Sequence, residues 1–167
     1  MVEHLVVMGV SGSGKTTVGR LLAGHLDRVF ADADDFHTAT NVAKMHAGQA
    51  LTDADRSPWL QAVAAWIGEY DAEGTPTVVA CSALKRSYRD VLRTAPGRIR
   101  FVHLAPSPAD IAARMRARTG HFMPPELLAS QLADLQPLTA DEDGVTVETA
   151  DGPEETVRMV LGALGEG

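Results

Sequence analysis

The stretch Gly9–Thr16 has the residue types and the spacing of a phosphate-binding loop. It reads Gly-Val-Ser-Gly-Ser-Gly-Lys-Thr and lies between an apolar run, Leu5–Met8, and a segment with helical apolar spacing. The glycines let backbone N–H groups turn toward one anion, and the N-terminus of the following helix adds partial positive charge. Lys15 is expected to reach the β- and γ-phosphates, and the Thr16 hydroxyl to bind Mg²⁺. An ordinary glycine turn capping a helix is disfavoured, because every fixed position of the motif is present. The stretch predicts a nucleoside triphosphate site made of Gly9, Ser11, Gly12, Ser13, Gly14, Lys15, Thr16 and Thr17.

Aspartates at the end of the next apolar run supply the carboxylates that phosphoryl transfer requires. Asp32 and Asp34 follow the run Arg28–Ala31, whereas the run Thr77–Ala80 ends in Cys-Ser with no acid. We expect Asp32 to act on the metal side, through water. Asp34 lies two residues on and therefore on the same side of a strand, where it could accept a proton from an attacking hydroxyl. The alternative is a solvated turn, but the carboxyl edge of a parallel sheet is where such folds bind ligands.

The passage Ala33–Asp55 is the longest without apolar periodicity, and we interpret it as a substrate loop. With the helix that follows it, this substrate region covers about residues 33–72. Its polar side chains suit a small polyhydroxylated or anionic molecule. Arg56 suits a carboxylate, because its planar fork can bond both oxygens. His37, Lys44 and Lys85 are weaker candidates for substrate contacts, since single His and Lys side chains are usually solvated.

Three arginines, Arg114, Arg116 and Arg118, precede a Gly-His-Phe-Met-Pro-Pro segment. Such a cluster forms either a favourable helix C-terminus or a mobile lid that brings cations to a transferring phosphoryl group. We favour a lid over about residues 114–130, because glycine and prolines follow and basic clusters are scarce elsewhere. Arg114 and Arg118 are spaced i and i+4 on one face and are preferred to Arg116 as catalytic cations.

Short apolar runs alternate with helical segments along the whole chain. This alternation predicts a three-layer α/β fold with a parallel sheet covered by helices on both faces. Helix starts are predicted at Ser57-Pro58, at Ser107-Pro108 and at Gly152-Pro153. The five expected strands are Leu5–Met8, Arg28–Ala31, Thr77–Ala80, Ile99–Leu104 and Val145–Glu148.

Composition limits the classes of function. The chain has 167 residues, which fits a single domain, 1–167, and its net charge of −7 argues against an extended nucleic-acid surface. No apolar run approaches the roughly 20 residues of a membrane span. The first strand comes too early for a signal peptide, and the single cysteine, Cys81, cannot form an internal disulfide. These features predict a cytoplasmic protein that acts on a small molecule.

The motifs together resemble the gluconokinases, which are P-loop kinases related to shikimate kinases and nucleoside monophosphate kinases. The resemblance runs in the family order from residue 5 to about residue 137. Thr38 and Ala50 stand where the family usually has proline. The matching segments are GVSGSGKTT at 9–17, DADDFH at 32–37, NVAKM at 41–45, LTDADRSPWL at 51–60, CSALKRSYRDVLR at 81–93, FVHL at 101–104 and RMRARTGHFMP at 114–124.

The resemblance implies ATP:D-gluconate 6-phosphotransfer, with ATP and Mg²⁺ required and 6-phospho-D-gluconate as the product. It also implies five parallel strands in the order 2-3-1-4-5, a mobile lid and often a homodimer. Asp34, His37 and Arg56 look like the gluconate contacts, and His121 in the lid motif joins the substrate candidates. Arg114 and Arg118 look like the lid arginines. The loop near 149–153 corresponds to the adenine wall of related kinases.

Two other readings stay open. One is another small-molecule kinase of the same fold, acting on shikimate or a nucleoside monophosphate. The other is a nucleotide-dependent switch or binding module with no transfer activity. A GTPase is disfavoured, because the chain has no Asn-Lys-x-Asp sequence for reading guanine.

Overall fold

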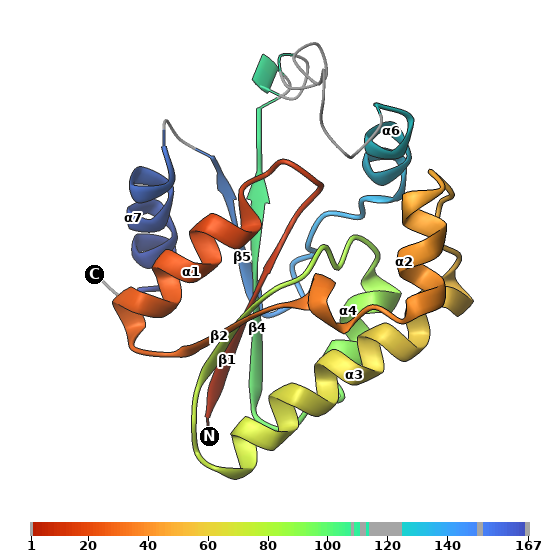
Figure 1. Ribbon diagram of the computed structural model, residues 1–167. Coiled ribbons are helices and arrows are strands. Elements are labelled where there is room, and N and C mark those ends of the chain that lie inside the picture. The colour runs from red at the N-terminus through yellow and green to blue at the C-terminus, as the bar shows by residue number, and fades with distance from the viewer. Residues whose placement is uncertain (1, 108, 111–112, 114–124, 150–151, 166–167) are drawn as a thin grey trace.

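The computed structural model describes residues 2–107, 109–110, 113, 125–149 and 152–165 (Figure 1). Its five parallel strands form one sheet in the order β2-β3-β1-β4-β5, which confirms the predicted fold class and strand order. The expected strands recur with ends shifted by at most two residues. They are β1 (Glu3–Met8), β2 (Val29–Asp32), β3 (Thr77–Ala80), β4 (Arg98–Ala105) and β5 (Gly144–Glu148).

Strand β1 is the centre of the sheet and belongs to both hydrophobic cores. It pairs with β3 on one side and β4 on the other, so that Val6 aligns with Val79 and Phe101. Val6 packs in the core on one face of the sheet, and Leu5 and Val7 pack in the core on the other. Because successive side chains of a strand point to opposite faces, a strand covered on both sides needs apolar residues at every position.

Helices cover both faces of the sheet, which gives three layers (Figure 1). Helices α1 (Lys15–Leu26) and α7 (Pro153–Leu164) lie against one face, and α3 (Asp53–Ala72) and α4 (Arg86–Leu92) lie against the other. Helix α6 (Pro125–Asp134) lies at the carboxyl edge of the strands. The predicted start of α7 is confirmed, because Gly152 is its N-cap residue and Pro153 its first residue.

Helix α3 begins five residues before the predicted start at Ser57-Pro58, so that prediction was wrong. Thr52 is the N-cap residue: its hydroxyl accepts from the Asp55 N–H at 3.1 Å, and the Asp55 carboxylate accepts from the Thr52 N–H at 2.9 Å. This reciprocal pair satisfies N–H groups that a helix start leaves unbonded. Pro58 lies inside the helix, where it lacks the N–H for one intrahelical bond.

The passage Ala33–Asp55 is also not the continuous loop that the sequence predicts. It contains the 3-10 turn η1 (Ala33–Phe36) and the helix α2 (Ala39–His46). Thr38 is the N-cap residue of α2, and its hydroxyl accepts from the Asn41 N–H at 3.1 Å. A two-turn helix offers too few apolar positions for its period to be recognised.

The predicted helix that starts at Ser107-Pro108 and the predicted lid lie mostly outside the described residues. The Asp110 N–H donates to the Ser107 hydroxyl at 3.1 Å, as expected for an N-cap at Ser107. Residues 114–124, which carry Arg114, Arg118 and His121, are among those that the structure does not describe.

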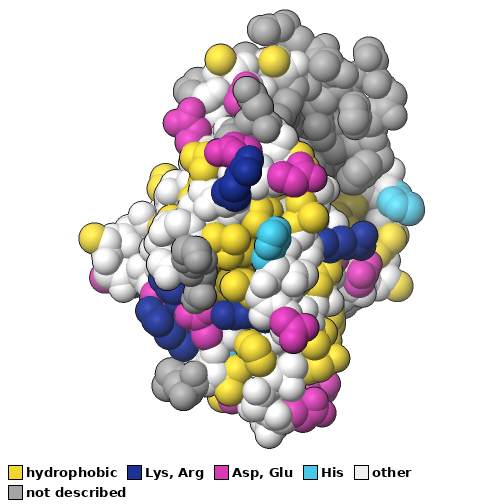
Figure 2. All heavy atoms as spheres, turned by 90° about the vertical axis from the view of Figure 1, so that its left-hand side faces the viewer, with side chains coloured by type: hydrophobic (Ala, Val, Ile, Leu, Met, Phe, Trp, Pro, Cys, Tyr) yellow, Lys and Arg dark blue, Asp and Glu magenta, His cyan; other side chains and the backbone are white. Residues whose placement is uncertain are grey.

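Two observations on the described residues bear on a membrane span and on the distribution of surface charge. Among the described residues, no helix combines the length and the apolar character needed to cross a membrane. Figure 2 shows the face of α1 and α7, where acidic and basic side chains are interspersed in small groups.

Candidate functional site

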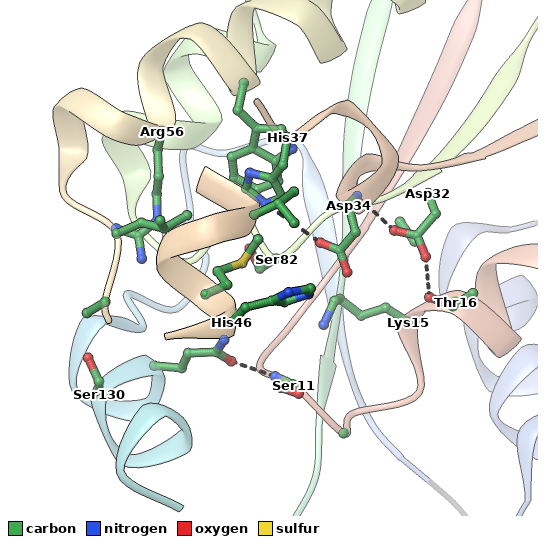
Figure 3. A pocket seen from close by; sticks show the side chains of 18 of the residues that line it. Ser11, Lys15, Thr16, Asp32, Asp34, His37, His46, Arg56, Ser82 and Ser130 are labelled. Atoms are coloured by element: carbon green, nitrogen blue, oxygen red, sulfur yellow. Dashed lines mark hydrogen bonds and ion pairs between the residues drawn. The ribbon is translucent and has the colours of Figure 1, made fainter. Parts of the chain in front are cut away.

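A pocket of about 740 Å³ lies at the carboxyl edge of the sheet, between the phosphate loop and helices α2, α3 and α6 (Figure 3). Its wall includes most of the phosphate loop from Ser11 to Thr17, together with Asp32, Asp34, His37 and Arg56. Residues from three separate stretches of the sequence-predicted site therefore meet around one cavity.

The phosphate loop depends on Gly9, the first residue after β1. Gly9 has φ +151°, a backbone conformation that side chains disfavour, and an added Cβ would lie 2.8 Å from the Leu104 carbonyl oxygen. Gly12 and Gly14 also have positive φ, at 82° and 92°. Glycine is therefore required by both the backbone turns and the close approach to β4.

Lys15 and Thr16 begin α1 and face Asp32, the last residue of β2, and Asp34 in η1 (Figure 3). The Lys15 ammonium donates to the Val10 carbonyl oxygen at 3.1 Å, back across the loop. Removal from water lowers the pKa of Lys15, and the neighbouring carboxylate of Asp34 opposes that shift. The Thr16 hydroxyl donates to Asp32 Oδ2 at 2.7 Å, which places a hydroxyl and a carboxylate side by side.

Asp34 lines the pocket from a 3-10 turn that the sequence did not predict. It lies in η1 and not on an extension of β2, so the alternation of side chains along a strand does not explain its position. Its backbone N–H donates to Asp32 Oδ1 at 2.9 Å, which fixes the turn. Partial removal from water and repulsion by Asp32 raise the pKa of Asp34, while Lys15 opposes the rise. The two aspartates thus differ in their surroundings: Asp32 already accepts two hydrogen bonds, and Asp34 faces the cavity.

His37 is held by a buried framework from α2 and α3. Its ring stacks on Trp59, with centroids 4.1 Å apart and planes 15° from parallel. Asn41, which is 2% exposed, donates its Nδ2–H to the Asp55 carbonyl oxygen at 2.9 Å and approaches His37 Nδ1 at 3.3 Å. Because an amide nitrogen only donates, Nδ1 must accept, and Nε2 must carry the proton. Burial and the nearby Arg56 lower the pKa of His37 to about 4, so His37 offers a neutral N–H donor.

Arg56 is aimed into the pocket by Tyr88 of α4. Its Nη1 donates to the Tyr88 hydroxyl at 2.8 Å, and the guanidinium carbon lies 5.2 Å from the centre of the Tyr88 ring. The Tyr88 hydroxyl in turn donates to Asp53 at 2.5 Å. Arg56 lies across the pocket from Lys15, on the far side of His37 (Figure 3).

Not every predicted substrate contact lines this pocket. The Lys44 ammonium lies 2.8 Å from Asp55 Oδ2, and the Lys85 ammonium lies 3.3 Å from Asp53 Oδ1. Neither lysine is part of the pocket wall, so the structure does not bring them together with Asp34 and His37. Arg114, Arg118 and His121 lie outside the described residues.

The structure adds pocket residues that sequence reasoning missed. They include His46 at the end of α2, Trp59 in α3, and Ser130 and Gln131 in α6. Besides lining the pocket, Trp59 donates its Nε1–H to the Ala33 carbonyl oxygen at 2.6 Å. Nothing in the local sequence of α6 separates Gln131 from an ordinary surface glutamine, because its role depends on contacts with distant residues.

A second, smaller pocket of about 280 Å³ adjoins the phosphate loop. It lies between α1 and the start of α7, and its wall includes Ser13, Thr149, Gly152 and Pro153. The Ser13 and Thr149 hydroxyls are buried without a hydrogen-bond partner among the described residues. Buried hydroxyls without partners are costly, so this pocket has polar groups available for a bound molecule.

Comparisons with known proteins agree with this geometry. The profile of the shikimate kinase family matches residues 11–164. A gluconokinase of Gluconobacter oxydans is 49% identical over 159 residues, which cover 95% of this chain and 89% of that protein. The crystal structure of a gluconokinase from Sinorhizobium meliloti is 47% identical, with a TM-score of 0.84 over 98% of this chain and 92% of the other. That of an unliganded sugar kinase from Janibacter is 46% identical, with a TM-score of 0.90 over 99% and 95% of the two chains. The chain therefore belongs to the shikimate kinase family and, within it, to the gluconokinases.

Proposed function

We propose that the protein transfers the γ-phosphoryl group of ATP to the 6-hydroxyl of D-gluconate, giving 6-phospho-D-gluconate and ADP. The observation that carries the proposal is that one pocket is lined by the phosphate loop together with Asp34, His37 and Arg56. Relatives named gluconokinase, similar over almost the whole chain, support the choice of acceptor.

The two ends of the pocket suit the two ends of gluconate. Arg56 offers its guanidinium to the carboxylate, since its fork matches two carboxylate oxygens. Asp34 lies beside Lys15 at the opposite end, where the 6-hydroxyl meets the γ-phosphate. The His37 Nε2–H can donate to a hydroxyl between these ends.

The transfer step then needs little covalent chemistry from the protein. The bond from O6 to the γ-phosphorus forms as the bond from that phosphorus to the bridging oxygen of ADP breaks, and the hydroxyl proton passes to Asp34. Lys15 and the loop N–H groups offset the negative charge on the phosphoryl oxygens. Arg114 and Arg118 would add to this from the lid, which stays a prediction of the sequence.

The chain also fits the nucleotide and its metal. Ser13 and Thr149, whose hydroxyls have no hydrogen-bond partner among the described residues, line the second pocket next to the phosphate loop, where an adenosine group can extend. Mg²⁺ takes few protein ligands beside water and phosphate oxygens, so Thr16 with Asp32, through water, is a sufficient donor set. When bound, the ion would neutralise phosphate charge. A homodimer and a cytoplasmic location also stay predictions of the sequence.

The proposal is tested by ADP release from purified protein with ATP, Mg²⁺ and one acceptor at a time. The acceptors are gluconate, shikimate, AMP and water alone. We expect ADP release with gluconate far above release with water, and none above water with shikimate or AMP. Lys15→Ala is the control for a contaminating kinase and should abolish turnover.

Two results would contradict the proposal. ADP release with shikimate or AMP but not with gluconate would move the protein to another kinase of the fold. ADP release no faster with any acceptor than with water would favour a nucleotide-binding module.

A further inference from the structure

Gln131 of α6 forms a hydrogen bond with the phosphate loop. This hydrogen bond has no role in the reaction proposed above. Its side-chain oxygen Oε1 accepts from the Ser11 backbone N–H at 2.6 Å, across 120 positions of sequence (Figure 3). Both residues line the large pocket, together with Lys15 and Asp34. A side chain from another part of the fold thus occupies a donor of the phosphate loop, at the pocket wall.

This hydrogen bond fixes which way the carboxamide faces. A backbone N–H can only donate, so the acceptor must be the oxygen, and the Nε2 amide must occupy the other position. Where the chain is described, the Gln131 Nε2 has no hydrogen-bond partner, and it is not buried away from water. Accepting a hydrogen bond at the oxygen also polarises the amide, which makes its N–H groups better donors.

On the basis of the proposed function, we propose that Gln131 is a catalytic residue that donates its Nε2–H to the γ-phosphoryl group of ATP. The side chain accepts from the Ser11 N–H of the loop and offers its own amide donor at the wall of the same pocket. A neutral donor suits this place, because its N–H stabilises the negative charge that develops on the phosphoryl oxygens. A cation would also attract the Asp34 carboxylate and so compete with Lys15, whereas a neutral amide does not.

The alternative is that Gln131 only ties α6 to the phosphate loop. Gln131→Glu separates the two roles. A glutamate keeps the shape of the side chain and can still accept from the Ser11 N–H, but it offers no N–H and repels a phosphate. Gln131→Met removes the tie and the donor together while roughly preserving volume.

A matched control lies five residues on. The Gln136 Oε1 accepts from the Arg86 backbone N–H at 2.9 Å, in an exposed position that is not part of the pocket wall. Gln136→Glu therefore makes the same chemical change in the same kind of hydrogen bond, away from the phosphates. We expect it to leave kcat and nucleotide affinity unchanged.

The experiment measures kcat, the KM for gluconate, and affinity for ADP and for a non-hydrolysable ATP analogue, together with thermal unfolding. For Gln131→Glu we expect kcat to fall about 100-fold, as for the loss of one donor to a transition-state oxyanion. Affinity for the ATP analogue should fall at least about tenfold. Affinity for ADP, the KM for gluconate and the unfolding temperature should stay close to those of the unchanged protein. Gln131→Met should also lower kcat and the preference for the ATP analogue over ADP.

The outcomes are distinguishable. Near-normal kcat and analogue affinity in Gln131→Glu, with losses only in Gln131→Met, would show a structural tie and overturn the inference. A rise in the KM for gluconate alone would place the contact on the acceptor and would also overturn it. If the unchanged protein itself does not phosphorylate gluconate, the proposed function fails first, and the preference of Gln131 variants for ADP over the analogue still tests the contact.

Discussion

At the scale of single residues, the site separates two neighbouring carboxylates by their surroundings. Asp32 accepts from the Thr16 hydroxyl and from the Asp34 N–H, so its oxygens are already engaged on the metal side. Asp34 faces the pocket, and its pKa is raised by partial removal from water and by Asp32. A carboxylate with a raised pKa is a better proton acceptor, which is the role that phosphoryl transfer asks of Asp34.

Asp34→Asn is expected to lower kcat by about 10²–10⁴-fold, because the amide cannot accept the hydroxyl proton. ATP affinity should stay within a few-fold, since the phosphate loop is unchanged. Steady-state kinetics and nucleotide titration check this. Asp35→Asn is the matched control, an exposed neighbour outside the pocket wall, and should act like the unchanged protein. A near-normal kcat in Asp34→Asn would contradict the assigned role.

In the unchanged protein, kcat should fall as the pH drops through the raised pKa of Asp34, because the protonated carboxyl group can no longer accept the hydroxyl proton.

His37 makes a second prediction about protonation. Its pKa is lowered to about 4 by burial and by Arg56, so the ring stays neutral throughout the range from pH 6 to 8. As the pH falls below about 6.5, the unfolded chain binds this proton before the folded one does, so His37 lowers the stability of the fold in acid. An NMR titration of the ring should give a midpoint near 4. A midpoint near 6.5 would contradict the burial of the His37 ring beside Arg56.

The residue scale also shows what sequence can and cannot predict. The phosphate loop and Asp32 are recognisable because their function needs a fixed local order of residue types. The tautomer of His37 and the donor role of Gln131 depend on Asn41 and Ser11, which are distant or buried partners. Lys44 and Lys85 were predicted as substrate contacts from their charge alone, and the structure pairs each with an aspartate outside the pocket wall.

At the scale of elements, a buried ion pair holds the turn between β3 and α4. Arg89 donates to both carboxylate oxygens of Glu142, at 2.6 and 3.0 Å, and the two side chains are 0% and 1% exposed. Arg89 also donates to the Ala83 carbonyl oxygen at 2.9 Å, where the backbone has φ +45°. The pair therefore supports an unfavourable backbone conformation next to Ser82 in the pocket wall.

Glu142→Gln should lower the free energy of unfolding by about 3–5 kcal/mol, because it leaves the Arg89 charge buried without its partner. Chemical denaturation measures the change. Asp141→Asn is the control: Asp141 pairs with Arg86 on the exposed surface, so its effect should be much smaller. Equal effects of the two variants would contradict the structural role of the buried pair.

The same pair predicts how stability depends on pH. Burial alone would raise the pKa of Glu142, but hydrogen bonds from Arg89, the Thr139 N–H and Arg93 hold it at about 2. A carboxyl group with a lowered folded pKa contributes its stability above the unfolded value of about 4.3. That contribution should be lost as the pH falls from there toward 2. In Glu142→Gln, this part of the acid dependence should disappear.

Elements differ in how far the sequence predicts them. The strands were predicted well, because each is a short apolar run with a clear end. The helix start at Gly152-Pro153 was predicted correctly. The start at Ser57-Pro58 was misplaced, because Thr52 and Asp55 form a capping box five residues upstream. Helix α2 was missed because its buried side, at Asn41, is polar.

At the scale of the whole molecule, the sheet order places the donor and acceptor regions side by side. After β1 the chain crosses past β3 to β2, and after β3 it crosses back past β1 to β4. Ligands of open parallel sheets bind at such a reversal, outside the carboxyl ends of the strands. The phosphate loop follows β1, and Asp32 and Asp34 lie at and just after the end of β2, so the reversal brings the donor loop next to the residues proposed for gluconate.

The central claim is the transfer of the γ-phosphoryl group to one hydroxyl of gluconate. It is tested most directly by ³¹P and ¹³C NMR of the product formed from ATP, Mg²⁺ and gluconate. We predict one phosphate monoester with phosphorus coupling to carbon 6, formed in step with ADP and absent with Lys15→Ala. Phosphate on another carbon, or free phosphate as the sole product beside ADP, would contradict the placement of Asp34 and Arg56 at opposite ends of the bound acceptor.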